Sequence, residues 1–207
     1  MNWFDEQRRQ LLNVYRDETF LRYLRDTAIA FLVLIAGSFV VGLFAPAIPV
    51  KIVSQFNQVV ADAGIADENG KFSAIPIFTH NFQAAISAIL YGLIPFLFLP
   101  ALVLGTNSML LGFVGAYYVN NGQSLFFYLA AILPHGIFEL PALVLAMSCG
   151  LYLCSRVTHR IHVGEKGVLR LAVNQILRLI LWQILPLLLI AALVEAYLTS
   201  AILKILA

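Results

Sequence analysis

The sequence LFFYLAAILPHGIFELPALVLAMSCGLYLC, which occupies residues 125–154, is apolar almost throughout and carries a single charged side chain, Glu139. The low charge extends well beyond this stretch, because Glu139 is the only charged residue between Lys71 and Arg156. An average soluble domain is about 25% charged, whereas this chain of 207 residues is 12% charged and 61% hydrophobic. We therefore expect an all-α polytopic membrane protein.

Apolar stretches separated by turn residues or polar segments predict about five transmembrane helices. A helix needs roughly 20 apolar residues to cross a bilayer. Prolines inside the second and fourth stretches predict kinks, and the fourth is long enough to require a break or a strong tilt. The predicted spans cover residues 27–47, 82–104, 109–119, 125–154 and 179–203, with a tight turn at residues 105–108.

The remaining segments are amphipathic or polar and predict structures at the membrane surface. Residues 1–26 place apolar side chains at helical spacing among five arginines and five acids. This pattern indicates a cytoplasmic amphipathic helix that lies on the bilayer or packs on a loop of its own protein. Residues 27–207 are expected to form one transmembrane domain, with an outer loop at 50–80 that holds a second short surface helix, and a cytoplasmic loop at 155–171.

Basic residues in short loops predict the orientation. The N-terminal segment carries five arginines and the connection at residues 155–178 carries five basic residues, while the 50–80 loop has two lysines against three acids. Five spans place both basic segments on one side, so we expect a protein of the cytoplasmic membrane with its N-terminus inside and its C-terminus outside. The net charge of +2 indicates no nucleic-acid partner, and the expected partner is the lipid bilayer.

Ionisable side chains inside the predicted spans are the candidate functional residues, because each costs on the order of 3 kcal/mol in hydrocarbon. His135 and Glu139 are four residues apart and would share one helix face. Counting about 1.5 Å per residue from the outer ends of the spans places Glu195 in the same layer of the bundle. The other polar residues at the ends of the spans are His80, Asn81 and Asn107.

Three interpretations of this cluster remain open. A hydrogen-bonded His–Glu pair would only lock helices together. Alternatively, imidazole with carboxylates is an ordinary ligand set for Zn²⁺ or a similar divalent metal. A third interpretation is a proton or substrate relay in a transporter or membrane hydrolase. No nucleotide-binding glycine motif, serine nucleophile elbow or HExxH motif is present, so the sequence favours a protein that is not an enzyme.

The block LPHGIFELPA at residues 133–142, followed by Gly150-Leu151, resembles the signature of the stage II sporulation protein M family. The resemblance extends over residues 77–200. Two positions differ from the family pattern: His80 stands in place of an asparagine, and Ser108 in place of a glycine. The supporting elements are His80-Asn81, Asn107 with Gly112, and Ala191–Ala196.

The resemblance implies a protein of the cytoplasmic membrane with five or six spans. Founding members of the family act in sporulation, where they anchor partner proteins that degrade peptidoglycan. By the family pattern, His135, Glu139 and Glu195 are the most important positions, followed by Asn81 and Asn107. We therefore expect a membrane scaffold for envelope remodelling, and the alternatives are an intramembrane metal-dependent enzyme and a permease-like transporter subunit.

Small residues in the spans allow helices to approach each other closely. Such residues are typical of interfaces between membrane helices. They suit a homodimer and packing within one chain equally well. These residues are Gly92, Gly112, Gly115 and Ala116.

Overall fold

The computed structural model describes residues 3–62, 73–199 and 201–202, and the elements within these ranges are all helices. Four helical segments are long and apolar enough to cross a membrane, namely α2, α5, α6 and the continuous run from α7 to η2. The all-α membrane class is therefore confirmed, while the number of five spans stays a prediction. The elements are α1 (Trp3–Val14), α2 (Glu18–Phe44), α3 (Ala47–Asp62), α4 (Ala74–Tyr91), α5 (Pro100–Asn120), α6 (Leu125–Val163), α7 (Val168–Leu179), the π-helix η1 (Ile180–Ile184), α8 (Leu185–Leu193) and the π-helix η2 (Val194–Thr199).

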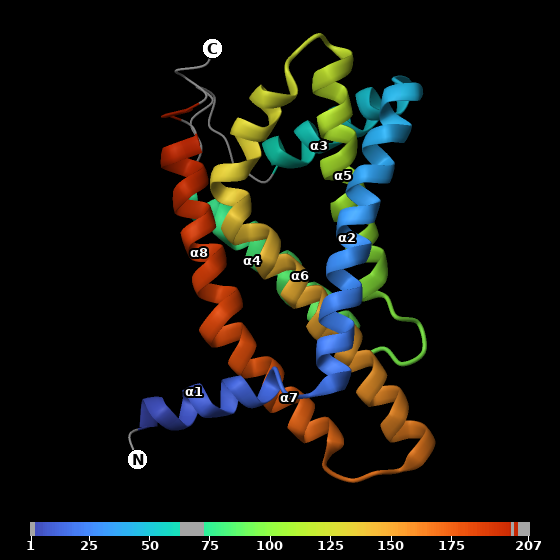
Figure 1. Cartoon of the computed structure of the whole chain (residues 1–207), viewed down its shortest axis with the longest axis vertical. Helices are drawn as coiled ribbons and strands as arrows, with labels where there is room; N and C mark the ends of the chain where they lie inside the picture. Colours follow the sequence, from blue (N-terminus) through green and yellow to red (C-terminus); the bar gives the residue numbers. More distant parts are fainter. Residues whose placement is uncertain (1–2, 63–72, 200, 203–207) are drawn as a thin grey trace.

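The N-terminal amphipathic segment is shorter than the sequence predicted. Helix α1 ends at Val14, and Asp17 then caps a new helix by accepting the backbone N–H groups of Thr19 and Phe20 at 2.9 and 3.2 Å. This arrangement is a standard helix N-cap. The charged residues 18–25 therefore form the first turns of α2, and only α1 lies crosswise at the lower end of the bundle (Figure 1).

The chain turns between α4 and α5 at residues 92–99, whereas the sequence analysis placed this turn at residues 105–108. Prolines explain the true position, because Pro95 interrupts the hydrogen bonding of a helix and Pro100 suits the first turn of the next one. The backbone at Phe96 has a φ of 66°, in the left-handed region. The predicted span 82–104 is therefore wrong.

Residues 105–108 continue as regular helix in α5. The hydroxyl of Ser108 donates to the carbonyl oxygen of Leu104 at 2.6 Å, and the amide of Asn107 donates to that of Val103 at 2.8 Å. Because these polar side chains bond to the preceding turn, the helix accommodates them without exposing unpaired groups to lipid. The short predicted span 109–119 is thus the second half of α5.

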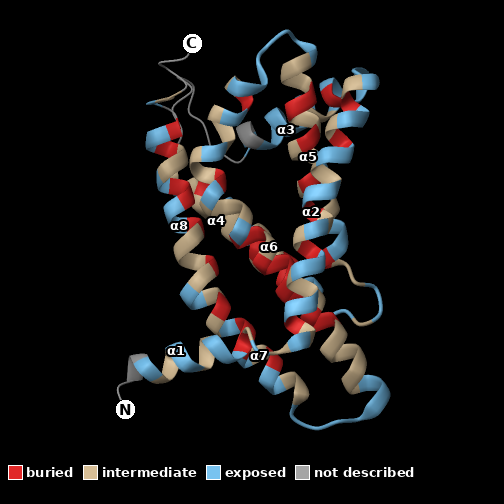
Figure 2. Cartoon of the chain, viewed as in Figure 1, coloured by how far each residue is buried: buried red, intermediate tan, exposed pale blue. Residues whose placement is uncertain are grey.

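Helix α6 forms the centre of the fold. It runs for 39 residues without a break through Pro134 and Pro141, and it ends where Gly164 adopts a φ of 76°. At 1.5 Å per residue its length is about 58 Å, roughly twice the thickness of the hydrocarbon core. Figure 1 shows it running diagonally across the bundle, so of the predicted break or strong tilt, the tilt agrees with the structure and the break does not. It contacts α2, α4, α5, α7, α8 and η2, and buried residues concentrate along it (Figure 2).

The small residues that suggested a homodimer pack within the chain. A Cβ on Gly112 would overlap α2, and a Cβ on Gly92 would overlap the backbone of Gly150 in α6. Ala116 is fully buried, and a Cβ added to Gly42 would lie 2.6 Å from the Ala116 Cβ. These residues therefore bring α5 against α2 and the end of α4 against α6, and they give no support to a dimer.

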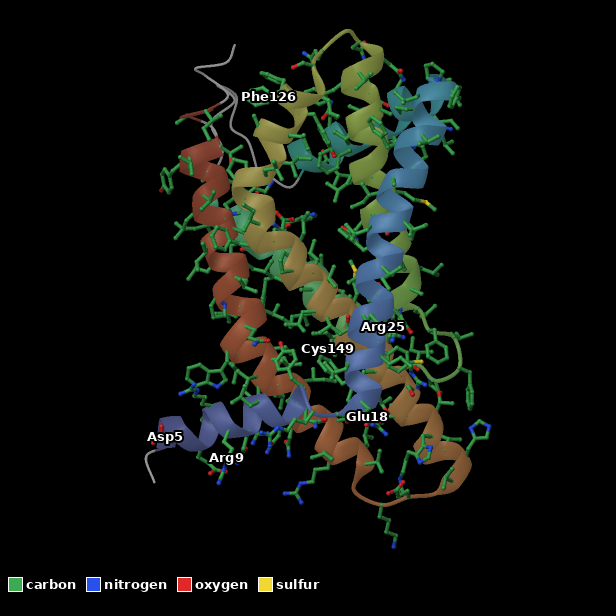
Figure 3. The ribbon with its side chains drawn as sticks, in the orientation of Figure 1. Asp5, Arg9, Glu18, Arg25, Phe126 and Cys149 are labelled. Atoms are coloured by element: carbon green, nitrogen blue, oxygen red, sulfur yellow. The ribbon has the colours of Figure 1, made fainter. Side chains whose placement is uncertain are left out.

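The last helical run begins earlier than predicted. Helix α6 continues to Val163 and α7 starts at Val168, so only residues 164–167 of the predicted 155–171 loop lie outside a helix. The connection between α6 and α7 lies at the same end of the bundle as α1 (Figure 1). Both Arg-rich segments therefore share one end, as predicted. Figure 3 shows the labelled charged residues Asp5, Arg9, Glu18 and Arg25 in the lower half of the molecule and Phe126 at the opposite end.

Candidate functional site

Two helical segments bring the three ionisable residues of the spans together. His135 and Glu139 lie one turn apart on α6, and Glu195 lies in η2. Each residue offers one potential ligand atom, and the three atoms lie within 4.8 Å of one another. The His135 Nε2 and Glu139 Oε2 atoms are 4.0 Å apart. The cluster expected from helix periodicity and depth therefore exists as a geometric unit.

A hydroxyl group orients the imidazole of His135. The Nδ1 atom lies 3.2 Å from the Oγ1 atom of Thr199, which is buried in η2. When Nδ1–H donates to this oxygen, the Nε2 atom keeps its lone pair on the side of Glu139. Histidine ligands of metals are commonly held by such a hydrogen bond from their second nitrogen.

Protein atoms cover most of the surface of the cluster. The side chains of His135 and Glu139 are 13% and 17% exposed, and they project from a helix that is long and apolar enough to span a membrane. Carboxylates at such depth require compensation. A shared proton or a bound cation would supply it, and both agree with the close approach of Glu139 and Glu195.

The donor set fits a divalent metal of the zinc type. One imidazole and two carboxylates combine nitrogen and oxygen ligands, which Zn²⁺ accepts at about 2.0–2.2 Å. Donors around a tetrahedral ion at those lengths lie roughly 3.4 Å apart, so the donors here would have to close by about 1.4 Å at most. A purely oxygen-binding ion such as Mg²⁺ fits less well because of the imidazole.

Glu195 reaches the cluster from a π-helix, a feature that the sequence analysis did not predict. In a π-helix the hydrogen bonds join residues five apart, so the side chains turn relative to an α-helix, and such segments are frequent at functional sites. The other π-helix, η1, contains Gln183, whose side chain accepts a hydrogen bond from the Tyr15 hydroxyl. Pro186 follows η1 and lacks the N–H that a regular α-helix would use there. Both π-helices therefore hold polar residues that connect to other helices.

The remaining polar residues of the sequence analysis lie elsewhere. His80 is exposed on α4 and Asn81 is half-buried beside it. Asn107 faces α6 near Leu143 and Ala146 and bonds its own helix. Within the described residues, His80 is not among the residues that lie close enough to share a metal with His135. The cluster therefore consists of His135, Glu139 and Glu195, supported by Thr199.

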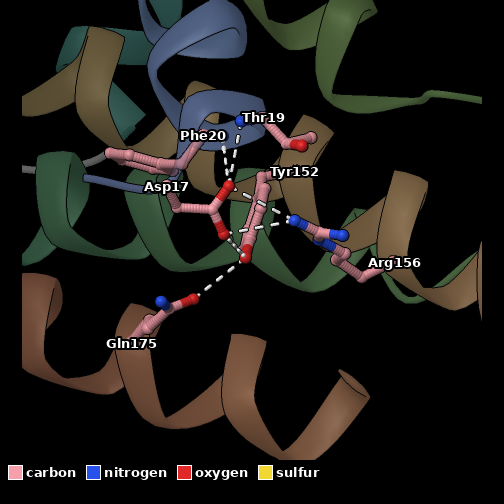
Figure 4. Close-up of polar contacts among 6 residues, drawn as sticks. All are labelled: Asp17, Thr19, Phe20, Tyr152, Arg156 and Gln175. Carbon is pink, nitrogen blue, oxygen red and sulfur yellow. Dashed lines mark hydrogen bonds and ion pairs between the residues drawn. The ribbon is translucent and has the colours of Figure 1, made fainter. Parts of the chain in front are cut away.

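A second polar cluster lies at the other end of α6 (Figure 4). The guanidinium of Arg156 donates to both oxygens of Asp17 at 3.1 and 3.3 Å, and the hydroxyl of Tyr152 donates to the same carboxylate at 2.7 Å. The Gln175 amide lies 2.9 Å from that hydroxyl. The atom at this distance is the amide oxygen, so the carboxylate and the amide oxygen share the single proton of the hydroxyl.

This network, which we call the Asp17 cluster, ties three helices together: α2 at its cap, α6 through Tyr152 and Arg156, and α7 through Gln175. Burial by itself raises the pKa of Asp17. The hydrogen bonds from Tyr152 and from the backbone of Phe20, together with the charge of Arg156, outweigh that effect and lower the pKa. The carboxylate is therefore held ionised by its partners.

Comparisons with known proteins give one family. No curated protein and no solved structure matches the chain. The family model described as stage II sporulation protein M matches residues 27–200, which include the His135 cluster and most of the Asp17 cluster. This match covers more than half of the sequence and contains all three ionisable residues of the spans. The chain therefore belongs to the stage II sporulation protein M family.

Proposed function

We propose that this protein is a non-enzymatic membrane scaffold that holds partner proteins for remodelling the cell envelope, and that a divalent metal stabilises it. The metal, Zn²⁺ by its donor set, would be held by His135, Glu139 and Glu195. The protein would reside in the cytoplasmic membrane with its N-terminus inside. The convergence of these three side chains on one point carries the metal part of the proposal.

Family membership supports the scaffold part. The described segments outside the four long apolar helices are short, namely α1, α3, α4 and the connections between helices. Such segments offer surfaces for partner helices and loops, and they leave little room for a separate catalytic domain. The arrangement is therefore that of a protein that acts through its membrane helices.

A metal bound between α6 and η2 would support the scaffold by linking these two helical segments. Helix α6 contacts most of the other helices, while η2 belongs to the last helical run of the described residues up to 199. Linking the two through coordinate bonds would fix the C-terminal helix against the centre of the bundle. Binding to the folded state alone stabilises it by RT ln(1 + [L]/Kd), about 4 kcal/mol at a thousandfold excess over Kd.

An intramembrane metal-dependent enzyme is the second candidate. Three protein ligands leave a fourth position for water, which is the pattern of catalytic rather than structural zinc. The permease hypothesis would require an aqueous path to Glu195, and nothing in the described part of the chain favours it.

The deciding experiment combines metal analysis with capture of partners. The full-length protein, purified in mild detergent after growth with zinc, should contain close to one zinc per chain, and Glu139→Gln and Glu195→Gln should lose it. Glu165→Gln is the matched control, because Glu165 is exposed and pairs with His159 outside the cluster. Mass spectrometry of cross-linked complexes should show peptidoglycan-cleaving enzymes enriched with the wild type and with the control.

The outcomes separate the hypotheses. Zinc without any enriched envelope enzyme would contradict the scaffold and favour the enzyme. Enriched partners without zinc, and unchanged by Glu139→Gln, would refute the metal while leaving the scaffold. Equal zinc in all the variants would show that these carboxylates are not ligands.

A further inference from the structure

A cleft of about 420 Å³ lies between α1 and the start of the last helical run, far from the His135 cluster along that run. It is open to its surroundings. Helices α1 and α7, which contribute to its lining, meet at the charged end of the bundle (Figures 1 and 3). A water molecule in the liquid occupies about 30 Å³, so the cleft has the volume of roughly fourteen waters. Its lining residues are Gln7, Asn174, Leu177, Arg178, Leu181 and Trp182.

The lining changes from polar to apolar along the helix. Asn174 and Arg178 lie one turn apart, and Trp182 lies one turn further on, so the three follow one another along one face. Leu181 beside Trp182 is 59% exposed, and Trp182 is 42% exposed. The polar end belongs to amphipathic α7, and the apolar end belongs to η1, where the apolar run begins. The cleft therefore crosses the level at which the chain passes from water into lipid, where tryptophan is enriched.

The charge at the polar end is positive. Glu6 on α1 accepts hydrogen bonds from Arg9 and Gln10, and it also interacts electrostatically with Arg178. Arg178 itself donates to the backbone carbonyl of Asn174 at 3.3 Å, which is the one acceptor found for it within the described residues. Arg178 is the charged residue among those that line the cleft, so the lining carries one positive charge. A guanidinium with donors to spare suits a phosphate group, which it binds in bidentate fashion.

We propose that this cleft binds the headgroup and upper acyl region of an anionic phospholipid from the surrounding bilayer. Arg178 contacts the phosphate, Gln7 and Asn174 hydrogen-bond the glycerol and ester oxygens, and Leu181 and Trp182 contact the acyl chains. A soluble phosphate would use only the polar end and would leave the apolar end uncovered, so the lining favours an amphiphile. The lipid would fill the space between α1 and α7 and hold α1 on the membrane surface.

This proposal is independent of the proposed metal and scaffold, because no residue of the cleft belongs to the His135 cluster. The test uses full-length protein, purified and delipidated in neutral detergent. Short-chain phosphatidylglycerol, short-chain phosphatidylcholine, glycerol phosphate and inorganic phosphate are titrated separately, and native mass spectrometry counts the bound molecules. The expected result is one saturable phosphatidylglycerol site, with at least about tenfold weaker binding of phosphatidylcholine.

The variants locate the site. Arg178→Gln should weaken phosphatidylglycerol binding about tenfold, the usual effect of losing one charge-assisted contact, and Arg178→Lys should weaken it less. Arg170→Gln is the matched control, because Arg170 is exposed on the same helix outside the cleft. It should bind within about twofold of the wild type. Thermal unfolding without lipid shows that each variant is folded.

Three results would overturn the proposal. If Arg178→Gln and Arg170→Gln weaken phosphatidylglycerol binding equally, general surface charge attracts the lipid. Inorganic phosphate or glycerol phosphate binding as tightly as phosphatidylglycerol would identify a soluble anion as the ligand. Equal binding of phosphatidylcholine and phosphatidylglycerol would show that Arg178 selects no anionic headgroup.

Discussion

Adding a single methyl group at Gly112 should separate two transmembrane helices. A Cβ at this position would lie 2.8 Å from the backbone nitrogen of Phe39 in α2 and closer still to the carbonyl oxygen of Ile35. Non-bonded heavy atoms need about 3.5 Å, so the contact of 2.3 Å with the Ile35 oxygen would force α5 and α2 apart by about 1.2 Å. Backbone atoms cannot rotate away as a side chain can, and overpacking of this kind costs about 1–3 kcal/mol.

Gly105 on the same helix provides a matched control. A Cβ there meets nothing within 4 Å, and alanine is favoured over glycine in a helix by about 0.8–1 kcal/mol. Gly112→Ala should therefore destabilise the protein while Gly105→Ala stabilises it. The difference between the two variants, about 2–4 kcal/mol, corresponds to roughly 4–16 °C in Tm for a chain of this size.

The buried cysteines supply the assay. Cys149 and Cys154 are free thiols and fully buried, so a thiol-reactive dye reports unfolding in detergent during a temperature ramp. The two variants are compared with the wild type under identical detergent and lipid. If Gly112→Ala melts at or above the temperature of Gly105→Ala, the close packing of α2 on α5 is not what the structure indicates.

Three further predictions concern the polar clusters. Asp17→Asn keeps the helix cap but leaves Arg156 without its carboxylate, and it should cost about 1–3 kcal/mol in thermal or denaturant unfolding; an unchanged stability would contradict the ion pair. Because partners lower the pKa of Asp17 below its ordinary value of 3.8, its contribution is present above that pH and is lost as the pH falls through the folded-state pKa. The wild type should therefore lose stability faster than Asp17→Asn below about pH 4, as a melting series against pH would reveal. Thr199→Val removes the hydrogen bond to His135 and should weaken zinc binding about 10–100-fold in competition with a chelating dye, and equal affinity would remove Thr199 from the site.

The sequence predicts the membrane class and most helices because long stretches without charge cannot form the surface of a soluble protein. It misplaces the turn between α4 and α5 because residues 105–108 have the composition of a turn. Inside a bilayer the same residues are tolerated in a helix when Asn107 and Ser108 bond to the preceding carbonyls. Proline positions were the better signal, since Pro95 lies within the true turn and Pro100 is the first residue of the next helix.

The candidate site was predictable to the extent that it depends on periodicity. His135 and Glu139 share a face by their spacing, and counting residues from the ends of the spans placed Glu195 at a similar depth. The π-helix that carries Glu195 gave no recognisable signal, because its composition is that of any apolar helix. The contact of Thr199 with His135 was not predicted either, because Thr199 lies in the same π-helix.

The Asp17 cluster was beyond sequence reasoning because its members come from three helices far apart in the chain. Arg156 was counted only as a basic residue of a cytoplasmic loop. Tyr152 and Arg156 have the same four-residue spacing as His135 and Glu139, which is the one local signal that they share a helix face. Only the three-dimensional arrangement brings Asp17 to them.

Because α6 is continuous, it fixes the direction in which the side chains of one polar cluster point around the helix axis relative to those of the other. Glu139 and Tyr152 are 13 residues apart, about 20 Å of rigid rod. One residue inserted or deleted between them would turn one end of the rod by about 100° against the other, and either the carboxylate of Asp17 or that of Glu195 would lose its partner. The length of this segment is therefore constrained more strictly than its composition, and exchanges of one apolar residue for another should be tolerated where a change in register is not.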